Sequence, residues 1–443
     1  MQSEALFRDK PVWKAISSLA IPSVFSVLIM VLYNMADMFF VGQLGNTAQV
    51  AAVSVVGPIF SLLSAVATML GAGGCALIAH SIGAGEKAYA RASASIVVWG
   101  CLLFGVFSAV GMNIFCHSIL RFLGATSDML IYAEKYLRVL ACGAPLMLLS
   151  TGSAMLLRAE GAIKEGFFIN LAGTIVNMVL DPLFILVLHM GVTGAAIATV
   201  LGNFVGTVCF LLYIRRGAKI VNFNLRLALS APKVLGRIMG LGMPNAVSSL
   251  LAGFASTFAN QLLGQYGTNS IAANGAAGKV TMLIGLIQMG ICMGAQPLMA
   301  YNCGAKNFVR LKEVLKKLAL LTFVFGVLTT ILCALARRTL IGMFLTQPDA
   351  AAMGERIVVW LTISGPLLGL YYISVNFLQA SGNAAAATIV SVLRQGIVLI
   401  PMLYIMNLLL GFTGIAAAQA IADISSAVIA VVICWWQLRR IQT

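Results

Sequence analysis

The chain has 443 residues, of which 60% are hydrophobic and only 9% are charged, and its mean hydropathy is +0.99. Soluble domains carry about 25% charged residues, so this composition excludes a soluble globular protein and indicates an integral membrane protein. The formal net charge is +15, which in so apolar a chain we interpret as an orientation signal and not as a nucleic-acid surface. Nine cysteines without C-x-x-C spacing and three isolated histidines show no metal or redox motif, so no cofactor is expected.

Twelve apolar segments follow one another along the chain, and most approach or exceed the roughly 20 residues that a membrane-spanning helix needs. They lack the short alternation of an outer-membrane barrel, so we expect helices. The predicted spans are 15–41, 52–80, 92–117, 136–157, 166–188, 194–214, 238–263, 278–300, 318–335, 357–378, 385–410 and 413–436. The predicted fold class is therefore all-α integral membrane.

The first segment carries a stripe of mostly polar residues at helical spacing. Its members are Ser23, Ser26, Met30, Tyr33, Asn34 and Asp37. Asp37 is an acid five residues before Gly42, where the segment is expected to reach the outer surface.

The fifth segment contains a second acid on a polar face. Asn170, Thr174, Asn177 and Asp181 are spaced by four, three and four residues, and Pro182 follows at once. A carboxylate inside the bilayer costs about 2.5–3.5 kcal/mol on insertion scales, so it usually faces a bundle interior or a watery path. We interpret it as part of an intramembrane cation or proton site; the alternatives are an acid paired only for structure, or a kink with no coupling role.

Asp181 lies ten residues before Gly191, and Thr199 lies five after Gly194, so both share the outer half of the membrane with Asp37. Carboxylate, amide and hydroxyl oxygens suit a small hard cation, and two neighbouring carboxylates can equally share a proton. The spacing therefore predicts that these groups meet.

Basic residues are unevenly divided between the two sides of the predicted spans. With the N-terminus inside, 20 of the 28 Lys and Arg residues lie on the inner side, 7 on the outer side, and Arg394 within a span. This bias predicts a multi-pass protein with both termini in the cytoplasm. The longest basic connection, 215–237, is expected to be a cytoplasmic linker lying at the membrane interface.

The two halves of the chain repeat each other. The segment LAIPSVFSVL (19–28) matches LGMPNAVSSL (241–250), GQLG (42–45) matches GQYG (264–267), and GVTGAAIA (191–198) matches GFTGIAAA (411–418), at offsets of 220–222. We expect an N-terminal six-helix lobe at 1–214, the linker at 215–237, and a C-terminal six-helix lobe at 238–443, related by pseudo-symmetry. Parallel repeats of this kind are typical of secondary transporters.

Several stretches together resemble the multidrug and toxic compound extrusion (MATE) family, in particular its prokaryotic DinF-like subgroup. They are YNMADMFFVGQLG (33–45), LIAHSIGAGE (77–86), LRAEG (157–161), NMVLDPLF (177–184) and GVTGAAIATVLGN (191–203). The resemblance covers the whole length. It implies export of organic cations or amphipathic compounds by alternating access, as antiport against H⁺ or Na⁺, in the inner membrane of a prokaryote. A monomer is expected.

By the same resemblance, Asp37, Asn177, Asp181 and Thr199 form a cation or proton site, with Na⁺ as one candidate, and helix 1 bends at Pro22. A static kink is the alternative for Pro22. Candidates for the substrate cavity are Met30, Tyr33, Asn34, Asn170, Asn260, Asp423 and Arg394.

The C-terminal half does not repeat the acids, because Ala259 and Met402 stand at the matching positions. For Asp423 we favour a pairing with Arg394 over a contact with substrate, since an unpaired charge in the membrane is costly. Glu160 and Glu165, beside Arg158 and Lys164, are expected to be solvated surface charges.

Two other functions remain open. A flippase for lipid-linked precursors would be favoured by a strongly cationic central cavity, for which Arg394 is the candidate. An intramembrane enzyme is disfavoured, because neither H-E-x-x-H nor G-x-S-x-G occurs.

Overall fold

The computed structural model describes residues 2–43, 47–345 and 347–442, and within these ranges the chain is helical with no strand. The helices of the first half are α1 (Gln2–Arg8), α2 (Val12–Gly42), α3 (Thr47–Gly83), α4 (Lys87–Ile114), α5 (Cys116–Phe122), α6 (Ser127–Glu160), α7 (Ile163–Pro182), the π-helix η1 (Leu183–Val187), α8 (Gly191–Arg215) and α9 (Leu225–Ser230). Those of the second half are α10 (Lys233–Gly264), α11 (Thr268–Gly304), α12 (Phe308–Gly342), α13 (Pro348–Ile363), α14 (Gly365–Ala380), α15 (Ala384–Val392), the π-helix η2 (Leu393–Val398), α16 (Leu399–Leu410) and α17 (Phe412–Arg440).

The number of spans agrees with the prediction. In the described residues eleven helices are long and apolar enough to cross a bilayer, or twelve if α13 and α14 form one span bent by 47°. The most apolar helix, α12, has a mean hydropathy of 2.5 over its best window, yet only 17% of that window is buried. An apolar surface left uncovered by protein is what a lipid-facing helix requires. The all-α membrane fold class is therefore confirmed.

Contacts between helices divide the chain into two compact units. The first contains Met1–Glu4 and Phe25–Gly242, and the second contains Ala5–Val24 and Met243–Thr443. Thus α2 passes from the second unit to the first just after Pro22, and α10 passes from the first to the second just before Pro244. The lobe boundaries at 214 and 238 stay a prediction, because lobes are defined by repeated sequence and these units by contacts.

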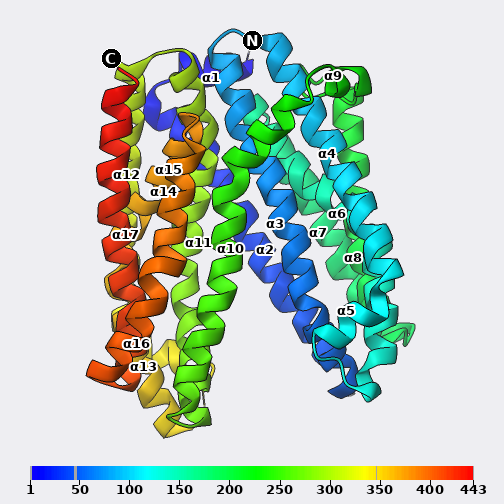
Figure 1. The fold of residues 1–443 in the computed structure, drawn as a ribbon, viewed down its shortest axis with the longest axis vertical. Helices are drawn as coiled ribbons and strands as arrows, with labels where there is room; N and C mark the ends of the chain where they lie inside the picture. Colours follow the sequence, from blue (N-terminus) through cyan, green and yellow to red (C-terminus); the bar gives the residue numbers. More distant parts are fainter. Residues whose placement is uncertain (1, 44–46, 346, 443) are drawn as a thin grey trace. The chain divides into compact units, whose positions relative to one another are not determined.

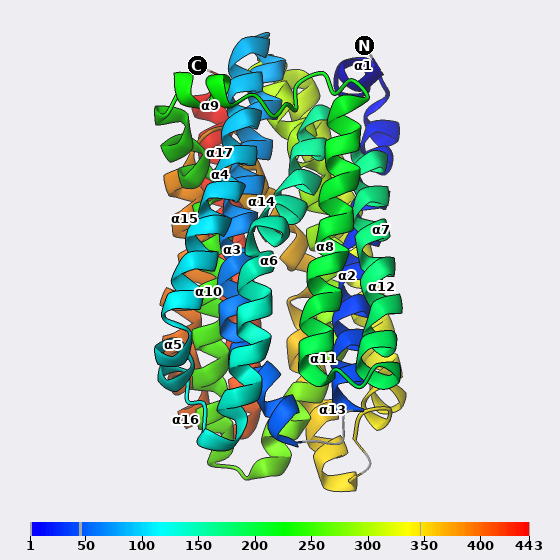
Figure 2. The same ribbon diagram turned by 90° about the vertical axis from the view of Figure 1, so that its right-hand side faces the viewer.

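Within each unit the helices are tightly associated. In the first unit α3, α4 and α6 run alongside one another (Figure 2), and α7 packs against α8. In the second unit α14 and α16 both pack against α17 (Figure 1). Helices α7 and α17, which carry two of the predicted acids, therefore pack against neighbouring helices of their own units.

The connection predicted as an interfacial linker is firmly attached to the first unit. Arg91 on α4 donates from Nε to the carbonyl of Lys219 at 3.1 Å, and Asn222 donates from Nδ2 to the carbonyl of Arg91 at 3.0 Å. The rings of Trp99 and Phe223 lie 4.7 Å apart, centroid to centroid. These contacts hold the connection against the ends of its neighbouring helices.

Glu160 corrects the sequence analysis, which expected a solvated charge. Its side chain is buried, and Oε1 accepts hydrogen bonds from the backbone N–H groups of Lys219 and Ile220. The LRAEG stretch ends α6 at Glu160, so the carboxylate meets backbone donors of the returning chain that no sequence pattern reveals.

Candidate functional site

The backbone is irregular where Asp181 lies. Helix α7 ends at Pro182, and the π-helix η1 begins at the next residue, Leu183. Proline has no N–H to donate, so the regular helical hydrogen bonding is interrupted at this point. Short π-helical stretches occur often at functional sites, because they place side chains off the regular register.

Close packing of α7 on α8 brings two predicted residues together. A Cβ on Gly202 would lie 2.7 Å from the carbonyl oxygen of Gly173 and 2.9 Å from Cβ of Asn177, so only glycine fits there. Because the two helices approach so closely, Nδ2 of Asn177 on α7 can donate a hydrogen bond to Oγ1 of Thr199 on α8, over 3.4 Å. Both side chains are buried, and Asp181, one helical turn after Asn177, is completely buried.

Helix α2 supplies the other side of the cluster. The Tyr33 hydroxyl forms a hydrogen bond with Thr199. The same side chain interacts electrostatically with Asp37 and with Asp181. Asp37 and Asp181 also interact electrostatically with each other. The structure thus brings Asp37, Asn177, Asp181 and Thr199 into one region of the first unit, from α2, α7 and α8.

Tyr136 on α6 belongs to the same region and was missed by the sequence analysis. Its side chain is buried, and it interacts electrostatically with Tyr33, Asp37 and Asp181. The one signal in the sequence was a tyrosine near the start of an apolar segment, a position that many interfacial tyrosines share. Only the packing of α6 against its neighbours distinguishes it.

The oxygens of this cluster lack hydrogen-bond partners. In the described part of the chain Asp37 Oδ1, Asn177 Oδ1 and both carboxylate oxygens of Asp181 are buried without a partner. Buried polar atoms are almost always satisfied, and a carboxylate at membrane depth is especially costly. Unsatisfied oxygens from two acids and an amide form a donor set for a small hard cation or a proton. Within the described residues, no group of three or more His, Cys, Asp or Glu side chains is arranged to hold a metal ion.

The acid of the second unit has the opposite surroundings. Asp423 Oδ1 accepts hydrogen bonds from Arg394 Nε at 2.7 Å and from Gln419 Nε2 at 3.0 Å, and Oδ2 accepts from Ser364 Oγ at 3.1 Å. The Arg394 guanidinium lies 4.7 Å from the ring centre of Tyr371. The predicted pairing of Arg394 with Asp423 is therefore confirmed, and it joins η2, α17 and the bend between α13 and α14.

The remaining predicted residues are dispersed over the two units. Met30 and Asn260 are exposed, Tyr33 and Asn170 are half-buried, and the side chain of Asn34 lies outside the described residues. Pro22 lies inside an unbroken α2. The substrate cavity and the hinge at Pro22 stay predictions.

A protein-family model supplies the class of this fold and site. The MatE model matches the chain twice, over residues 22–183 and 244–405, a displacement of 222 residues at both ends. Its two copies begin at Pro22 and Pro244, the prolines paired by the internal repeat. The chain belongs to the MatE family, the multidrug and toxic compound extrusion transporters.

Individual relatives cover nearly the whole chain. The multidrug export protein MepA of Staphylococcus aureus (strain MSSA476) is 30% identical over 437 residues, 98% of this chain and 96% of MepA. MepA of Staphylococcus saprophyticus is 30% identical over 440 residues, with the same coverage.

Solved structures show the same fold. The outward-facing conformation of a multidrug resistance MATE family transporter matches with a TM-score of 0.93 at 25% identity, covering 100% of this chain and 99% of that one. A transporter of the MOP superfamily from Pyrococcus furiosus matches with a TM-score of 0.92, again over 100% and 99%, but at 24% identity it supports the fold alone.

Proposed function

We propose that this protein is a secondary active multidrug exporter that moves organic cations or amphipathic compounds outward in exchange for H⁺ or Na⁺. The observation that carries the coupling is the set of unsatisfied buried oxygens on Asp37, Asn177 and Asp181. Family membership and the multidrug export relatives support the transport function. The proposal needs no cofactor besides the coupling ion, H⁺ or Na⁺.

The coupling mechanism follows from charge. When empty, the site holds two nearby carboxylates that repel each other in a poorly hydrated interior. Binding of H⁺ or Na⁺ neutralises these carboxylates and removes their repulsion. The empty and the ion-bound site therefore favour different arrangements of α2 relative to α7 and α8. Thr199 and Asn177 contribute a hydroxyl and an amide oxygen beside the two carboxylates. Tyr33 on α2 and Tyr136 on α6 border the same cluster.

The location is proposed from the distribution of basic residues. We place the protein in the plasma membrane of a prokaryote as a multi-pass monomer with both termini in the cytoplasm. Export is favoured over lipid flipping because the charge of Arg394, the one basic candidate for a cationic cavity, is neutralised by Asp423.

Transport into inverted membrane vesicles tests the proposal. Export then becomes uptake of a fluorescent organic cation, measured with an imposed H⁺ gradient or an imposed Na⁺ gradient, each in the absence of the other. We expect one gradient to drive uptake, and the matching ionophore to abolish it. Absence of uptake under both gradients, with folded protein present in the vesicles, would contradict cation-coupled export.

A further inference from the structure

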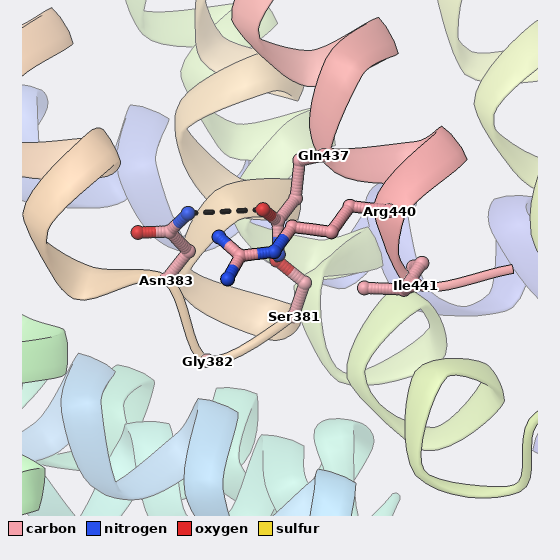
Figure 3. Close-up of a pocket in the computed structure, with 6 residues that line it drawn as sticks. All are labelled: Ser381, Gly382, Asn383, Gln437, Arg440 and Ile441. Carbon is pink, nitrogen blue, oxygen red and sulfur yellow. Dashed lines mark hydrogen bonds between the residues drawn. The ribbon is translucent and has the colours of Figure 1, made fainter. Parts of the chain in front are cut away.

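A pocket of about 340 Å³ lies in the second unit. It is formed by the turn between α14 and α15 and by the last turn of α17. The residues that line it are Ser381, Gly382, Asn383, Gln437, Arg440 and Ile441 (Figure 3). None of these residues belongs to the cluster around Asp181 or to the pair of Asp423 and Arg394.

The floor of the pocket is held by hydrogen bonds between the two elements. Asn383 donates from Nδ2 to Oε1 of Gln437 at 2.9 Å, and Gln437 donates from Nε2 to Oγ of Ser381 at 3.3 Å. Gly382 has a φ of +83°, which permits the sharp turn that presents Ser381 and Asn383 together. Each side-chain NH₂ has two hydrogens, and these bonds use one of each. The pocket is therefore preformed and lined by N–H donors.

Among the described lining residues, Arg440 has the one charged side chain. Arg440 extends from α17 with its guanidinium toward Asn383 and Ser381 (Figure 3), and the lining residues include no carboxylate in the described part of the chain. Asn383 caps the N-terminus of α15 by accepting from the N–H of Ala386 at 3.1 Å, and this end of a helix favours negative charge. A guanidinium with neighbouring N–H donors suits phosphate oxygens.

The position of the pocket along α17 places it among lipid headgroups. Helix α17 has 29 residues, about 43 Å at 1.5 Å per residue, which equals the thickness of a bilayer with its headgroups. The preceding residues Trp435 and Trp436 are exposed, as expected for rings at the membrane interface. The adjacent Arg439 is not among the residues that line the pocket, and its guanidinium lies 3.7 Å from the Trp435 ring centre.

We propose that this pocket binds a phosphate-bearing anion, either the headgroup of an anionic phospholipid or free phosphate. Arg440 supplies the charge, and the carboxamides of Asn383 and Gln437 supply directed donors. This site is independent of the transport function proposed above. Basic pockets between spans at the cytoplasmic side commonly hold anionic headgroups, which agrees with the basic inner face of this chain.

The test uses purified protein in an uncharged detergent, titrated separately with dioctanoyl phosphatidylglycerol, dioctanoyl phosphatidylcholine and sodium phosphate. Binding is measured as a saturable rise in unfolding temperature. For the ligand that binds, we expect Arg440→Gln to raise the dissociation constant by about tenfold or more, as loss of a charge-assisted contact predicts. Ser381→Asp should weaken binding as well, because it places a negative charge in the pocket while Arg440 stays.

Arg439→Gln is the matched control, being the neighbouring exposed arginine outside the pocket, and should change the dissociation constant by less than about twofold. Saturation by phosphatidylglycerol but not by phosphatidylcholine or phosphate assigns the site to a lipid headgroup, and saturation by phosphate assigns it to the free ion. The proposal is overturned if neither anion saturates, or if Arg440→Gln and Arg439→Gln bind alike.

Discussion

Two buried aspartates in this protein have opposite surroundings. Asp423 accepts three side-chain hydrogen bonds, one of them from Arg394, whereas neither carboxylate oxygen of Asp181 has a partner in the described residues. A satisfied ion pair stabilises one arrangement, while an unsatisfied carboxylate gains most from an arriving cation or proton. From these surroundings we propose a structural role for Asp423 and an ion-binding role for Asp181.

Asp37→Asn and Asp181→Asn should each abolish gradient-driven uptake into inverted vesicles. Asparagine keeps the shape but removes the charge that H⁺ or Na⁺ neutralises, so the protein should still fold and reach the membrane. The measurement is uptake normalised to folded protein, judged by size-exclusion chromatography in detergent. Asp9→Asn, at an exposed acid in the first residues of the chain, is the control and should transport normally. Full uptake by both site variants would exclude this cluster as the coupling site.

Asp423→Asn should mainly destabilise the protein. Breaking one side of a buried ion pair costs about 3–5 kcal/mol in soluble proteins, because the partner charge is left behind. Combining it with Arg394→Gln should recover part of the loss, since no unpaired charge then remains. Unfolding temperatures in detergent and transport per folded molecule are compared for the single and double variants. Unchanged stability together with lost transport would instead indicate a direct role in substrate binding.

At the scale of elements, α2 and α10 cross their neighbours at points where only small residues fit. In the first unit a Cβ on Gly242 of α10 would lie 1.8 Å from the carbonyl oxygen of Met69 on α3. In the second unit a Cβ on Gly294 of α11 would lie 2.6 Å from the carbonyl oxygen of Leu19 on α2. Small residues at such crossings let helix backbones approach closely, which is a main source of helix association in lipid.

Gly242→Ala should therefore damage the first unit, because the added methyl group meets rigid backbone and not a movable side chain. Overpacking of this kind costs about 1–3 kcal/mol or more, and should lower the unfolding temperature. Gly236→Ala in the same helix is the matched control. Nothing lies within 4 Å of its Cβ, so it should be neutral or gain up to about 1 kcal/mol of helix propensity. Equal unfolding temperatures for the two variants would show that the close crossing is unimportant.

At the scale of the whole molecule, one continuous helix links parts of both units. Helix α2 begins within the second unit and carries Tyr33 and Asp37 within the first, and it contains Pro22 just before it changes unit. The proline removes one backbone hydrogen bond, so bending there is cheaper than elsewhere in the helix. We therefore propose that a shift at the Asp37–Asp181 cluster is passed along α2 to residues of the other unit.

If coupling works in this way, the ion and the substrate should weaken each other's binding. Linkage requires the effect to be reciprocal, with an expected coupling factor of about 5–150-fold. Pro22→Ala should reduce the factor by stiffening α2, whereas Pro244→Ala should matter less because α10 carries no acid. Substrate affinity in detergent is measured across pH and Na⁺ concentration for wild type and both variants. A substrate affinity that does not change with pH or Na⁺ concentration would count against this mechanism. So would a larger loss of coupling from Pro244→Ala than from Pro22→Ala.

The proposed orientation makes a separate prediction. Green fluorescent protein fused after the C-terminus should fluoresce in a bacterial host, and alkaline phosphatase fused after Thr126 should be active. The first reporter works only in the cytoplasm and the second only outside it. The reverse pattern would contradict the orientation inferred from the basic residues.

Much of the fold could be predicted from the sequence. Twelve apolar segments have about the length that a helix needs to cross a bilayer, and the repeat of Pro22 at Pro244 indicates two related halves. Asp37 and Asp181 could be identified because a charged side chain inside the bilayer costs free energy and so indicates a specific role. Arg394 could be identified as a partner for Asp423 because it lies in the neighbouring segment. These are local or periodic features, and hydrophobicity and charge are sufficient to detect them.

Other features depended on contacts between distant segments. Tyr136 joins the cluster of buried acids only because α6 packs against α7 and α8. Glu160 is buried only because the chain returns after α8 and offers it the N–H groups of Lys219 and Ile220. The pocket at Arg440 exists because the turn at Gly382 meets the end of α17. Hydropathy reports which residues leave water, whereas the partners they meet are decided by helix packing, and in a bilayer that packing depends on backbone fit at a few small residues.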